Sequence, residues 1–172
     1  MSIKKIVLLG YMGSGKSTVA RLLSEDLSID LTDLDDFIEK SETSTITDIF
    51  KSKGEIYFRK KEYFYLKQLL NSDRSMILSV GGGTPCYSGN IDLINKLATS
   101  VYLRSSVQSL YNRLIKEKNK RPLIAHIPDE DLKEFIAKHL FEREPYYEQA
   151  EFTVDTDDKT PQEIVLELSR LI

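Results

Sequence analysis

The stretch Gly10-Tyr11-Met12-Gly13-Ser14-Gly15-Lys16-Ser17 decides the fold of this chain. It fits the pattern G-x-x-x-x-G-K-[ST], the phosphate-binding P-loop, at every fixed position. The apolar run Ile6-Val7-Leu8-Leu9 precedes it, as a buried parallel strand should. Apolar residues follow it at helical spacing, namely Val19, Leu22, Leu23 and Leu27. Strand, glycine-rich loop and helix therefore occur in the order that a phosphate site of this kind requires.

The residue types of this loop suit a nucleoside triphosphate. Glycines let the backbone turn so that successive N–H groups point at phosphate oxygens, and the following helix adds its positive end. Lys16 is expected to reach the β- and γ-phosphates, and Ser17 to coordinate Mg²⁺. A plain glycine-rich turn beside a solvated lysine would need the pattern and both its flanks to coincide by chance. We therefore predict nucleotide binding.

The composition indicates a single globular domain without a nucleic-acid or membrane partner. The 172 residues, 41% hydrophobic and 30% charged, suffice for a core and do not fit a disordered chain. A net charge of −3 argues against general binding of nucleic acid. Cys86 is the only cysteine, so neither an internal disulfide nor a cysteine metal cluster is possible. No signal peptide or membrane-length apolar run is seen, so we expect a cytoplasmic protein.

A second group of glycines marks the other loop of interest. Gly81-Gly82-Gly83 follows the apolar run 76–80, as the P-loop follows its own strand. Both loops are therefore expected at the carboxyl edge of one sheet, where α/β proteins bind ligands. The triple glycine allows a ligand to lie against backbone amides. The alternative is a flexible turn, for which three glycines cost considerable folding entropy.

The rest of the chain alternates strands with helices. Short apolar runs predict further strands at 29–31, 100–103 and 152–154. Predicted helices begin at Thr45, Glu55 and Thr160, follow a cap at Ser105, and span about 131–150 with an interruption near Pro145. The helix 55–70 is expected to bury one stripe, made of Ile56, Tyr63, Leu66, Leu69 and Leu70. The pattern implies a single three-layer α/β/α domain with a parallel sheet.

Three charged stretches allow two interpretations each from the residues alone. Asp33 and Asp35 follow a strand and suit either helix capping or a role with Mg²⁺ or substrate. Arg59 fits an ordinary solvated helix position. The basic tract 116–122 is typical of a solvated loop, but it also suits a mobile lid in which Arg121 reaches phosphates.

Taken together, the motifs resemble the shikimate kinases, in the nucleoside-monophosphate-kinase-like branch of P-loop proteins. The likeness runs from residue 6 to about 168 and rests on six motifs in order: the P-loop, Asp33-Leu34-Asp35, Gly54-Glu55-x-x-Phe58-Arg59, Gly81-Gly82-Gly83, Arg121-Pro122-Leu123 and Arg143-x-Pro145-x-Tyr147. The resemblance implies a five-stranded parallel sheet in the order 2-3-1-4-5. Within a single kinase domain, 1–172, it implies a substrate-binding region at about 33–61 and a lid at about 112–126. The implied reaction transfers the γ-phosphoryl group of ATP to the 3-hydroxyl of shikimate.

The resemblance also implies residue roles. Asp35 would bind the shikimate hydroxyls and orient or deprotonate the attacking one, while Arg59 and Arg143 would hold the carboxylate beside Gly81, Gly82 and Gly83. Asp33 and Ser17 would hold Mg²⁺. The nucleotide would contact the remaining P-loop and lid positions, namely Gly13, Ser14, Gly15, Lys16, Thr18, Arg113, Arg121 and Pro161. Lys16, Asp35 and Arg121 would act in catalysis.

These roles suit the chemistry of a small polyol with one carboxylate. Arginine presents a planar fork that matches two carboxylate oxygens, and an aspartate accepts hydrogen bonds from hydroxyl groups. Phosphoryl transfer depends mainly on positioning and charge neutralisation, so Asp35 serves either as an orienting group or as a base. The substitutions Thr84-Pro85 and Ile124 are local variation, whereas Asp157-Asp158 leaves the adenine contacts open.

Other functions remain as alternatives. A gluconate or nucleoside monophosphate kinase shares the fold, and gluconate is also a polyol carboxylate. A GTPase-like switch needs N-K-x-D, whereas the nearest stretch, Asn95-Lys96-Leu97-Ala98, lacks the aspartate. A monomer is expected, and His126, His139 and Cys86 are expected to be structural or incidental.

Overall fold

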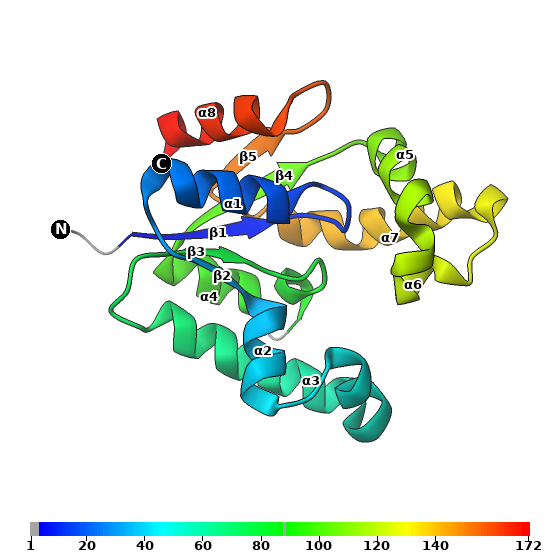
Figure 1. The fold of residues 1–172 in the computed structure, drawn as a ribbon, viewed down its shortest axis with the longest axis horizontal. Helices are drawn as coiled ribbons and strands as arrows, with labels where there is room; N and C mark the ends of the chain where they lie inside the picture. The colour runs from blue at the N-terminus through cyan, green and yellow to red at the C-terminus, as the bar shows by residue number, and fades with distance from the viewer. Residues whose placement is uncertain (1–3, 88) are drawn as a thin grey trace.

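The centre of the fold is a parallel sheet in the order β2-β3-β1-β4-β5 (Figure 1). The computed structural model describes residues 4–87 and 89–172, so the first residues, which were expected to lead directly into a strand, lie outside the described part. All four neighbouring strand pairs are parallel, which confirms the predicted fold class and strand order. The strands are β1 (Lys5–Leu9), β2 (Leu31–Asp33), β3 (Met76–Ser79), β4 (Thr99–Arg104) and β5 (Phe152–Asp155).

Helices cover both faces of this sheet. They are α1 (Lys16–Leu27), α2 (Leu34–Glu42), α3 (Ile46–Leu70), α4 (Asn90–Leu97), α5 (Val107–Glu117), α6 (Pro122–Ala125), α7 (Asp129–Tyr147) and α8 (Pro161–Leu171), with short 3-10 turns η1 (Thr84–Cys86) and η2 (Lys118–Lys120). Figure 1 shows α1 and α8 on one face of the sheet and α3 and α4 on the other. In the described chain, no helix is both long enough and apolar enough to cross a membrane.

The alternation of side chains along β1 divides the core between the two faces. Ile6 and Leu8 pack with α1 and α8 in one hydrophobic cluster. Val7 and Leu9 pack in the other cluster with α3, α4 and α7. All four side chains are fully buried. A strand that buries both faces must be apolar at every position, which explains the continuous run before the P-loop.

One predicted strand, one helix N-cap and one predicted helix interruption need correction. β2 lies two residues later than predicted, because Leu31, and not Ile29, begins the register with β3. The N-cap of α5 is Ser106, whose side chain accepts from the Ser109 N–H, because the Ser105 hydroxyl bonds to Thr156. The helix α7 runs through Pro145 without interruption and ends at Tyr147. Pro145 lies near the C-terminal end of α7, where the hydrogen bond it removes costs little.

The helix α3 bends at Gly54, where the sequence predicted a break. Gly54 has φ +82 and ψ 173, a conformation that favours glycine. The predicted inward stripe is wrong at Ile56, whose side chain is 75% exposed. The buried face instead carries Phe58, Glu62, Tyr65, Leu66, Leu69 and Leu70. The predicted stripe shares Leu66, Leu69 and Leu70 with this face, so the prediction is wrong only in the earlier turns of the helix.

The helix α4 was not predicted, although it forms the crossover between β3 and β4. It contains Asn95 of the N-K-x-D alternative. The Asn95 side chain donates to the Gln149 carbonyl at 2.7 Å and accepts from the Ser100 hydroxyl at 2.6 Å. Asn95 is therefore occupied in joining α4 to β4 and to the segment before β5, and it does not face either cavity described below.

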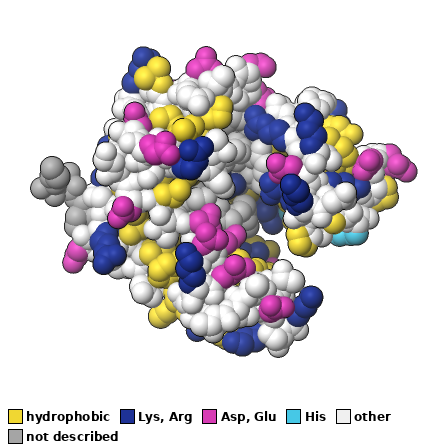
Figure 2. Space-filling view, in the orientation of Figure 1, with side chains coloured by type: hydrophobic (Ala, Val, Ile, Leu, Met, Phe, Trp, Pro, Cys, Tyr) yellow, Lys and Arg dark blue, Asp and Glu magenta, His cyan; other side chains and the backbone are white. Residues whose placement is uncertain are grey.

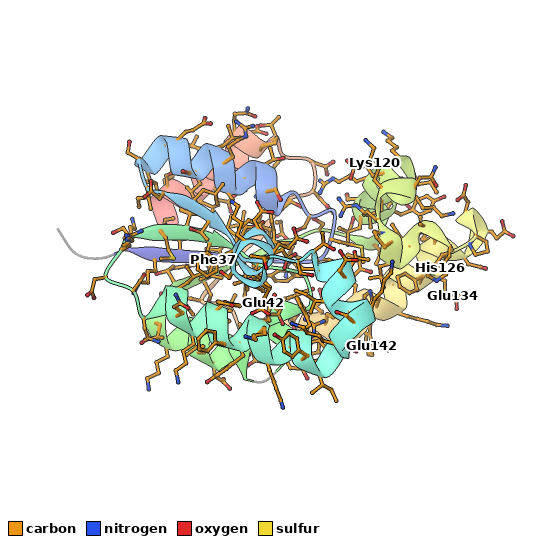
Figure 3. The ribbon with its side chains drawn as sticks, turned by 60° about the horizontal axis from the view of Figure 1, so that its bottom comes forward. Phe37, Glu42, Lys120, His126, Glu134 and Glu142 are labelled. Carbon is orange, nitrogen blue, oxygen red and sulfur yellow. The ribbon has the colours of Figure 1, made fainter. Side chains whose placement is uncertain are left out.

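A buried carboxylate joins α2 to α3. Glu42 lies between the two helices (Figure 3), and its side chain is 7% exposed. It accepts hydrogen bonds from the hydroxyls of Tyr57 and Tyr65, both at 2.7 Å, and pairs with Lys61 at 2.9 Å. These donors, with Tyr57 first, lower the pKa of Glu42 to about 2. The charged form is thus held at all physiological pH values, and it fixes the region that follows β2.

Candidate active site

The P-loop adopts the conformation its glycines allow. Gly13 has φ +79 and Gly15 has φ +91, and Gly15 forms the N-cap of α1. A Cβ on Gly13 would lie 3.0 Å from the Leu114 side chain, so α5 packs directly on the loop. The Lys16 ammonium donates to the carbonyls of Gly10 at 2.7 Å and Tyr11 at 2.9 Å. The lysine therefore lies folded over the loop that precedes it.

The surroundings of Lys16 favour an anion. Burial is the main reason why the pKa of Lys16 falls to about 8, and the charge of Arg121 lowers it further. Asp35 and Asp33 oppose the shift. The described residues place no carboxylate within ion-pair distance of this ammonium, and a phosphate group would supply such a partner.

A cavity of about 440 Å³ opens beside this lysine. Figure 2 shows a hollow between the body of the sheet and the lobe that carries α5 and α6, with Lys and Arg side chains on the lobe. The cavity brings together eleven residues that the sequence assigned to the site: Gly13, Gly15, Lys16, Ser17, Thr18, Asp33, Asp35, Gly81, Gly82, Arg113 and Arg121. It adds four that sequence reasoning missed: Met12, Ser79, Val80 and Glu117.

The two aspartates after β2 have different surroundings. The Asp33 side chain caps α2, since its Oδ1 accepts from the N–H groups of Asp35 at 2.9 Å and Asp36 at 3.3 Å. The capping interpretation is therefore confirmed for Asp33. Asp35 faces the cavity instead. Burial and the neighbouring charge of Asp33, with smaller contributions from other carboxylates, raise the pKa of Asp35 to about 6.

The triple glycine brings Asp35 and two arginines together. A Cβ on Gly81 would lie 3.5 Å from Asp35 Oδ1, and one on Gly82 would lie 3.2 Å from an Arg143 guanidinium nitrogen. A Cβ on Gly83 would lie 3.0 Å from Arg59 Nη2 and 3.5 Å from Arg143 Nη2.

Both guanidinium groups thus reach one loop from different helices, Arg59 from α3 and Arg143 from α7. They lie beyond Gly82, outside the wall of the 440 Å³ cavity. Since each glycine leaves room that a Cβ would fill, the loop forms a charged cradle with a carboxylate at one end and two cations at the other. This cradle suits a small anion that also carries hydrogen-bond donors.

Glu62 supports this cradle from behind, and sequence reasoning missed it. Glu62 is 1% exposed. It accepts from Arg59 Nη1 at 2.8 Å and from the Thr84 hydroxyl at 2.6 Å. The available signal was a glutamate in the same helical phase as Phe58 and Leu66, which a solvated residue would not occupy. Arg59 also lies over the Tyr87 ring, 3.9 Å from its centroid, and its buried Nε has no hydrogen-bond partner among the described residues.

The predicted lid tract is helical and not a loop. The helix α5 continues to Glu117, η2 follows, and Pro122 starts α6 at its first position, a place that suits proline. Arg121 pairs with Glu117 at 2.9 Å and points into the 440 Å³ cavity. Ile124 is fully buried and Ile127 nearly so, which fastens the tract to the core. His126, by contrast, lies exposed at the end of α6 (Figure 3).

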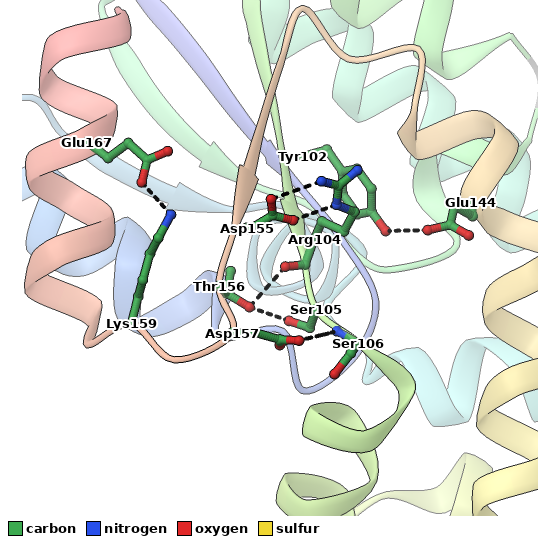
Figure 4. A network of polar contacts seen from close by, with 10 residues as sticks. All are labelled: Tyr102, Arg104, Ser105, Ser106, Glu144, Asp155, Thr156, Asp157, Lys159 and Glu167. Carbon is green, nitrogen blue, oxygen red and sulfur yellow. Dashed lines mark hydrogen bonds and ion pairs between the residues drawn. The ribbon is translucent and has the colours of Figure 1, made fainter.

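A second cavity of about 220 Å³ adjoins the P-loop on the other side. Five residues predicted near the nucleotide line it, namely Ser14, Gly15, Thr18, Arg113 and Pro161. Four that were not predicted also line it, namely Val19, Thr156, Lys159 and Ile164. Figure 4 shows how the ends of β4 and β5 build its rim. Ser105 and Thr156 hydroxyls are 2.5 Å apart, and the Asp157 carboxylate accepts from the Ser106 N–H at 3.2 Å. Asp157 is therefore engaged with the backbone, and Lys159 pairs with Glu167 at 2.6 Å.

The residues present fit a magnesium ion that arrives with a nucleotide. Nowhere in residues 4–87 and 89–172 do three or more His, Cys, Asp and Glu side chains form a metal-binding group. Mg²⁺, however, is usually held by one or two carboxylates together with substrate phosphates and water. Ser17 and Asp33 both line the 440 Å³ cavity, called the phosphate cavity below. One oxygen of Asp33 is not used by the cap of α2.

The P-loop with its lysine, the nucleotide-sized cavities and the charged cradle on the same sheet edge define a P-loop phosphotransferase with a separate acceptor pocket. The shikimate kinase family model matches residues 12–172. The chain belongs to the shikimate kinase family.

Relatives and solved structures agree with this assignment. The chain is 46% identical over 171 residues to a shikimate kinase of Flavobacterium psychrophilum, covering 99% of both chains. It is 50% identical over 167 residues to that of Flavobacterium johnsoniae, covering 96% of this chain and 97% of the relative. A crystal structure of the Bacteroides thetaiotaomicron shikimate kinase superposes with a TM-score of 0.91 at 30% identity, covering 99% and 98% of the two chains. That of Acinetobacter baumannii in complex with shikimate gives 0.86 at 31%, covering 99% and 93%.

Proposed function

We propose that this chain transfers the γ-phosphoryl group of ATP to the 3-hydroxyl of shikimate, giving shikimate 3-phosphate and ADP. The observation that carries the proposal is the cradle at Gly81 to Gly83, where Asp35, Arg59 and Arg143 converge beside the P-loop. Membership of the shikimate kinase family supports this acceptor over gluconate or a nucleotide. A nucleotide switch is also disfavoured, because a switch has no use for an acceptor pocket.

The acceptor binds with its carboxylate on the arginines. Arg59 and Arg143 present guanidinium planes to the carboxylate, and Glu62 holds Arg59 in place. Asp35 accepts hydrogen bonds from the ring hydroxyls at the opposite end of the cradle. The region 33–61 supplies most of this site, since it contains both Asp35 and Arg59. Glu62 already neutralises part of the Arg59 charge, so the carboxylate adds the second anion that two guanidinium groups require.

The nucleotide lies in the two cavities on either side of the P-loop. Gly13, Ser14, Gly15 and Thr18 surround the phosphates, while Arg113 and Pro161 lie beside the base in the 220 Å³ cavity. The lid, residues 112–126, closes so that Arg121 exchanges Glu117 for phosphate oxygens. Bound Mg²⁺, held by Ser17 and Asp33, neutralises phosphate charge and orients the triphosphate.

The chemical step needs alignment more than a strong base. The 3-hydroxyl oxygen attacks the γ-phosphorus, the bond to the β–γ bridging oxygen breaks, and the hydroxyl proton passes to Asp35. Lys16 and Arg121 stabilise the charge on the transferring group. All these groups come from one chain, which supports a monomer as the active form. The family assignment also supports a cytoplasmic location.

The direct test is ADP release from ATP and Mg²⁺ with shikimate, gluconate and AMP as parallel acceptors. Release that depends on shikimate alone is the expected result. Faster release with gluconate or AMP would overturn the acceptor assignment while leaving the nucleotide site intact. Release with none of the three would contradict the proposed reaction, and nucleotide affinity would then be measured directly.

Replacing Arg143 by Ala is expected to raise the half-saturating shikimate concentration about 10- to 100-fold, with a smaller fall in kcat. The reason is that the cradle loses half of its carboxylate clamp. Initial rates at saturating ATP measure the effect. Arg143→Lys keeps the charge without the planar fork. Its half-saturating shikimate concentration should therefore lie between those of the unaltered enzyme and Arg143→Ala. An unchanged half-saturating concentration in Arg143→Ala would place the carboxylate elsewhere.

The pH dependence of kcat/KM for shikimate is expected to be bell-shaped. Asp35 can take the hydroxyl proton only when it is deprotonated, so activity should rise as the pH passes about 6, its raised pKa. Lys16 carries its charge only below about 8, its lowered pKa, so activity should fall above that value. Because the pKa values are those of the free enzyme, the profile is measured with shikimate varied at a fixed ATP concentration well below half-saturation, where kcat/KM reports that form. An acid limb near 4, where an ordinary aspartate titrates, would contradict the role of Asp35.

A further inference from the structure

One polar contact joins the P-loop to the helix that carries Arg143. The Tyr11 hydroxyl and His139 Nδ1 are 2.8 Å apart, a hydrogen bond in which the imidazole tautomer decides the donor. Their rings meet edge to face with centroids 5.4 Å apart. Tyr11 is 1% exposed and lies outside the walls of both cavities. Neither side chain has a part in the reaction as described so far.

Each end of this contact is attached to a different half of the active site. The Tyr11 carbonyl accepts from the Lys16 ammonium at 2.9 Å and from the Ser14 N–H at 3.2 Å, so its backbone belongs to the phosphate loop. His139 lies one helical turn before Arg143 on α7. The hydrogen bond therefore connects a residue that senses the nucleotide to the helix that holds the acceptor.

Arg143 is bracketed by two such anchors. One turn after it, the Tyr147 hydroxyl donates to the Gly82 carbonyl at 2.5 Å. Residues 139, 143 and 147 are spaced four apart and share one face of α7. His139 thus fixes that face to the P-loop and Tyr147 fixes it to the triple glycine. A helix held at both points presents Arg143 in one position to the loop between them.

We infer that the Tyr11–His139 hydrogen bond is a positioning contact, which makes the grip of Arg143 on the acceptor depend on the state of the P-loop. The inference rests on the proposed role of Arg143 in binding the shikimate carboxylate. When phosphates bind, Lys16 leaves the Tyr11 carbonyl for phosphate oxygens, and the P-loop backbone adjusts. The buried Tyr11 side chain carries that adjustment to α7. Nucleotide and acceptor then bind cooperatively through this pair.

The electrostatics of the pair agree with this role. Burial and the neighbouring charge of Arg143 lower the pKa of His139, so the imidazole is neutral at pH 7. A neutral Nδ1 is free to accept from the tyrosine hydroxyl. The Phe135 ring packs on His139 with centroids 5.2 Å apart, which holds the imidazole in place.

The test measures shikimate binding by titration calorimetry with and without saturating ADP and Mg²⁺. In the unaltered enzyme, nucleotide should tighten shikimate binding about 5-fold or more. His139→Leu removes the hydrogen bond, and the ratio of the two affinities should fall toward one. His139→Asn presents an amide near the position of Nδ1, and it should keep most of the ratio. In steady-state rates, the leucine variant should raise half-saturating shikimate more than it lowers kcat.

Tyr11→Phe keeps the buried ring and removes only the hydroxyl, so it should lose the same share of the ratio as His139→Leu. The double variant should lose no more than either single variant. Equal ratios in the unaltered enzyme and His139→Leu would overturn the inference, as would additive losses in the double variant. Failure of the proposed function gives a different result, because shikimate would then bind neither with nor without nucleotide, in any variant.

Discussion

Replacing Lys16 by Ala is expected to lower kcat by about 1,000-fold or more while the chain stays folded. Lys16 lies at the rim of the phosphate cavity and bonds only to the carbonyls of Gly10 and Tyr11, which it exchanges for phosphate oxygens. Nothing else in the described chain supplies a cation from the P-loop itself. The lost interaction is strongest in the transition state, so the fall appears in kcat and not only in KM.

The fold should tolerate this change. The lowered pKa of Lys16 means that its charged form is disfavoured by the folded structure, so removing the ammonium costs no stability. Rates are measured by ADP release and folding by thermal unfolding. Lys67→Ala, on the exposed side of α3, is the matched control and should leave the rate unchanged. Turnover of Lys16→Ala within about 10-fold of the unaltered enzyme would refute the assigned role.

Replacing Asp35 by Asn is expected to lower kcat by about 100- to 10,000-fold and to raise the thermal midpoint. The amide still fills the site but accepts fewer hydrogen bonds and cannot take the hydroxyl proton. The stability follows from the raised pKa, about 6, of Asp35. In the folded chain this carboxylate prefers its proton, so above pH 6 the ionised form destabilises the fold, and a neutral side chain removes that cost.

Asp36→Asn is the control for this change, because Asp36 is the exposed neighbour on the same helix turn. It should alter neither the rate nor the thermal midpoint appreciably. Thermal unfolding at several pH values tests the argument, since the gain from Asp35→Asn should be complete above about pH 6, partial at pH 5 and absent only below the ordinary aspartate pKa of 3.8. A loss of only about 10-fold in kcat would assign Asp35 an orienting role and exclude a base. A lowered midpoint at pH 8 would contradict the electrostatic argument.

The elements that sequence reasoning found are those with local signals. The P-loop, the cap of α8 at Thr160 and the break at Gly54 each depend on residues within one or two turns of each other. Of the two alternatives for Asp33, capping of α2 is confirmed, while the role with Mg²⁺ stays a prediction for a residue that lines the 440 Å³ cavity. Strand order is not local, and it followed from the family resemblance.

The features that were missed depend on partners far apart in the chain. Glu62 is buried where the Thr84 hydroxyl donates a hydrogen bond to its carboxylate. The residues next to position 62 in the sequence do not indicate this distant partner. Tyr11 and His139 are separated by 128 positions. Ile56 was misplaced because the predicted stripe took the apolar residue at helical spacing, whereas the buried face of these turns carries Phe58 and the charged Glu62. Of the four cavity residues that were missed, Met12, Ser79 and Val80 carry no charge that would mark them as functional in the sequence.

The triple glycine also bears on how the enzyme would evolve under a drug. A Cβ on Gly83 would lie 3.0 Å from Arg59, and one on Gly82 would lie 3.2 Å from Arg143. A substitution there that excludes an inhibitor would also displace the guanidinium groups that we propose hold the substrate. Mutations of this loop that confer resistance to a carboxylate inhibitor would therefore also reduce the activity of the enzyme. Compounds confined to the 220 Å³ cavity, which Lys159 and Ile164 line, would not contact this loop.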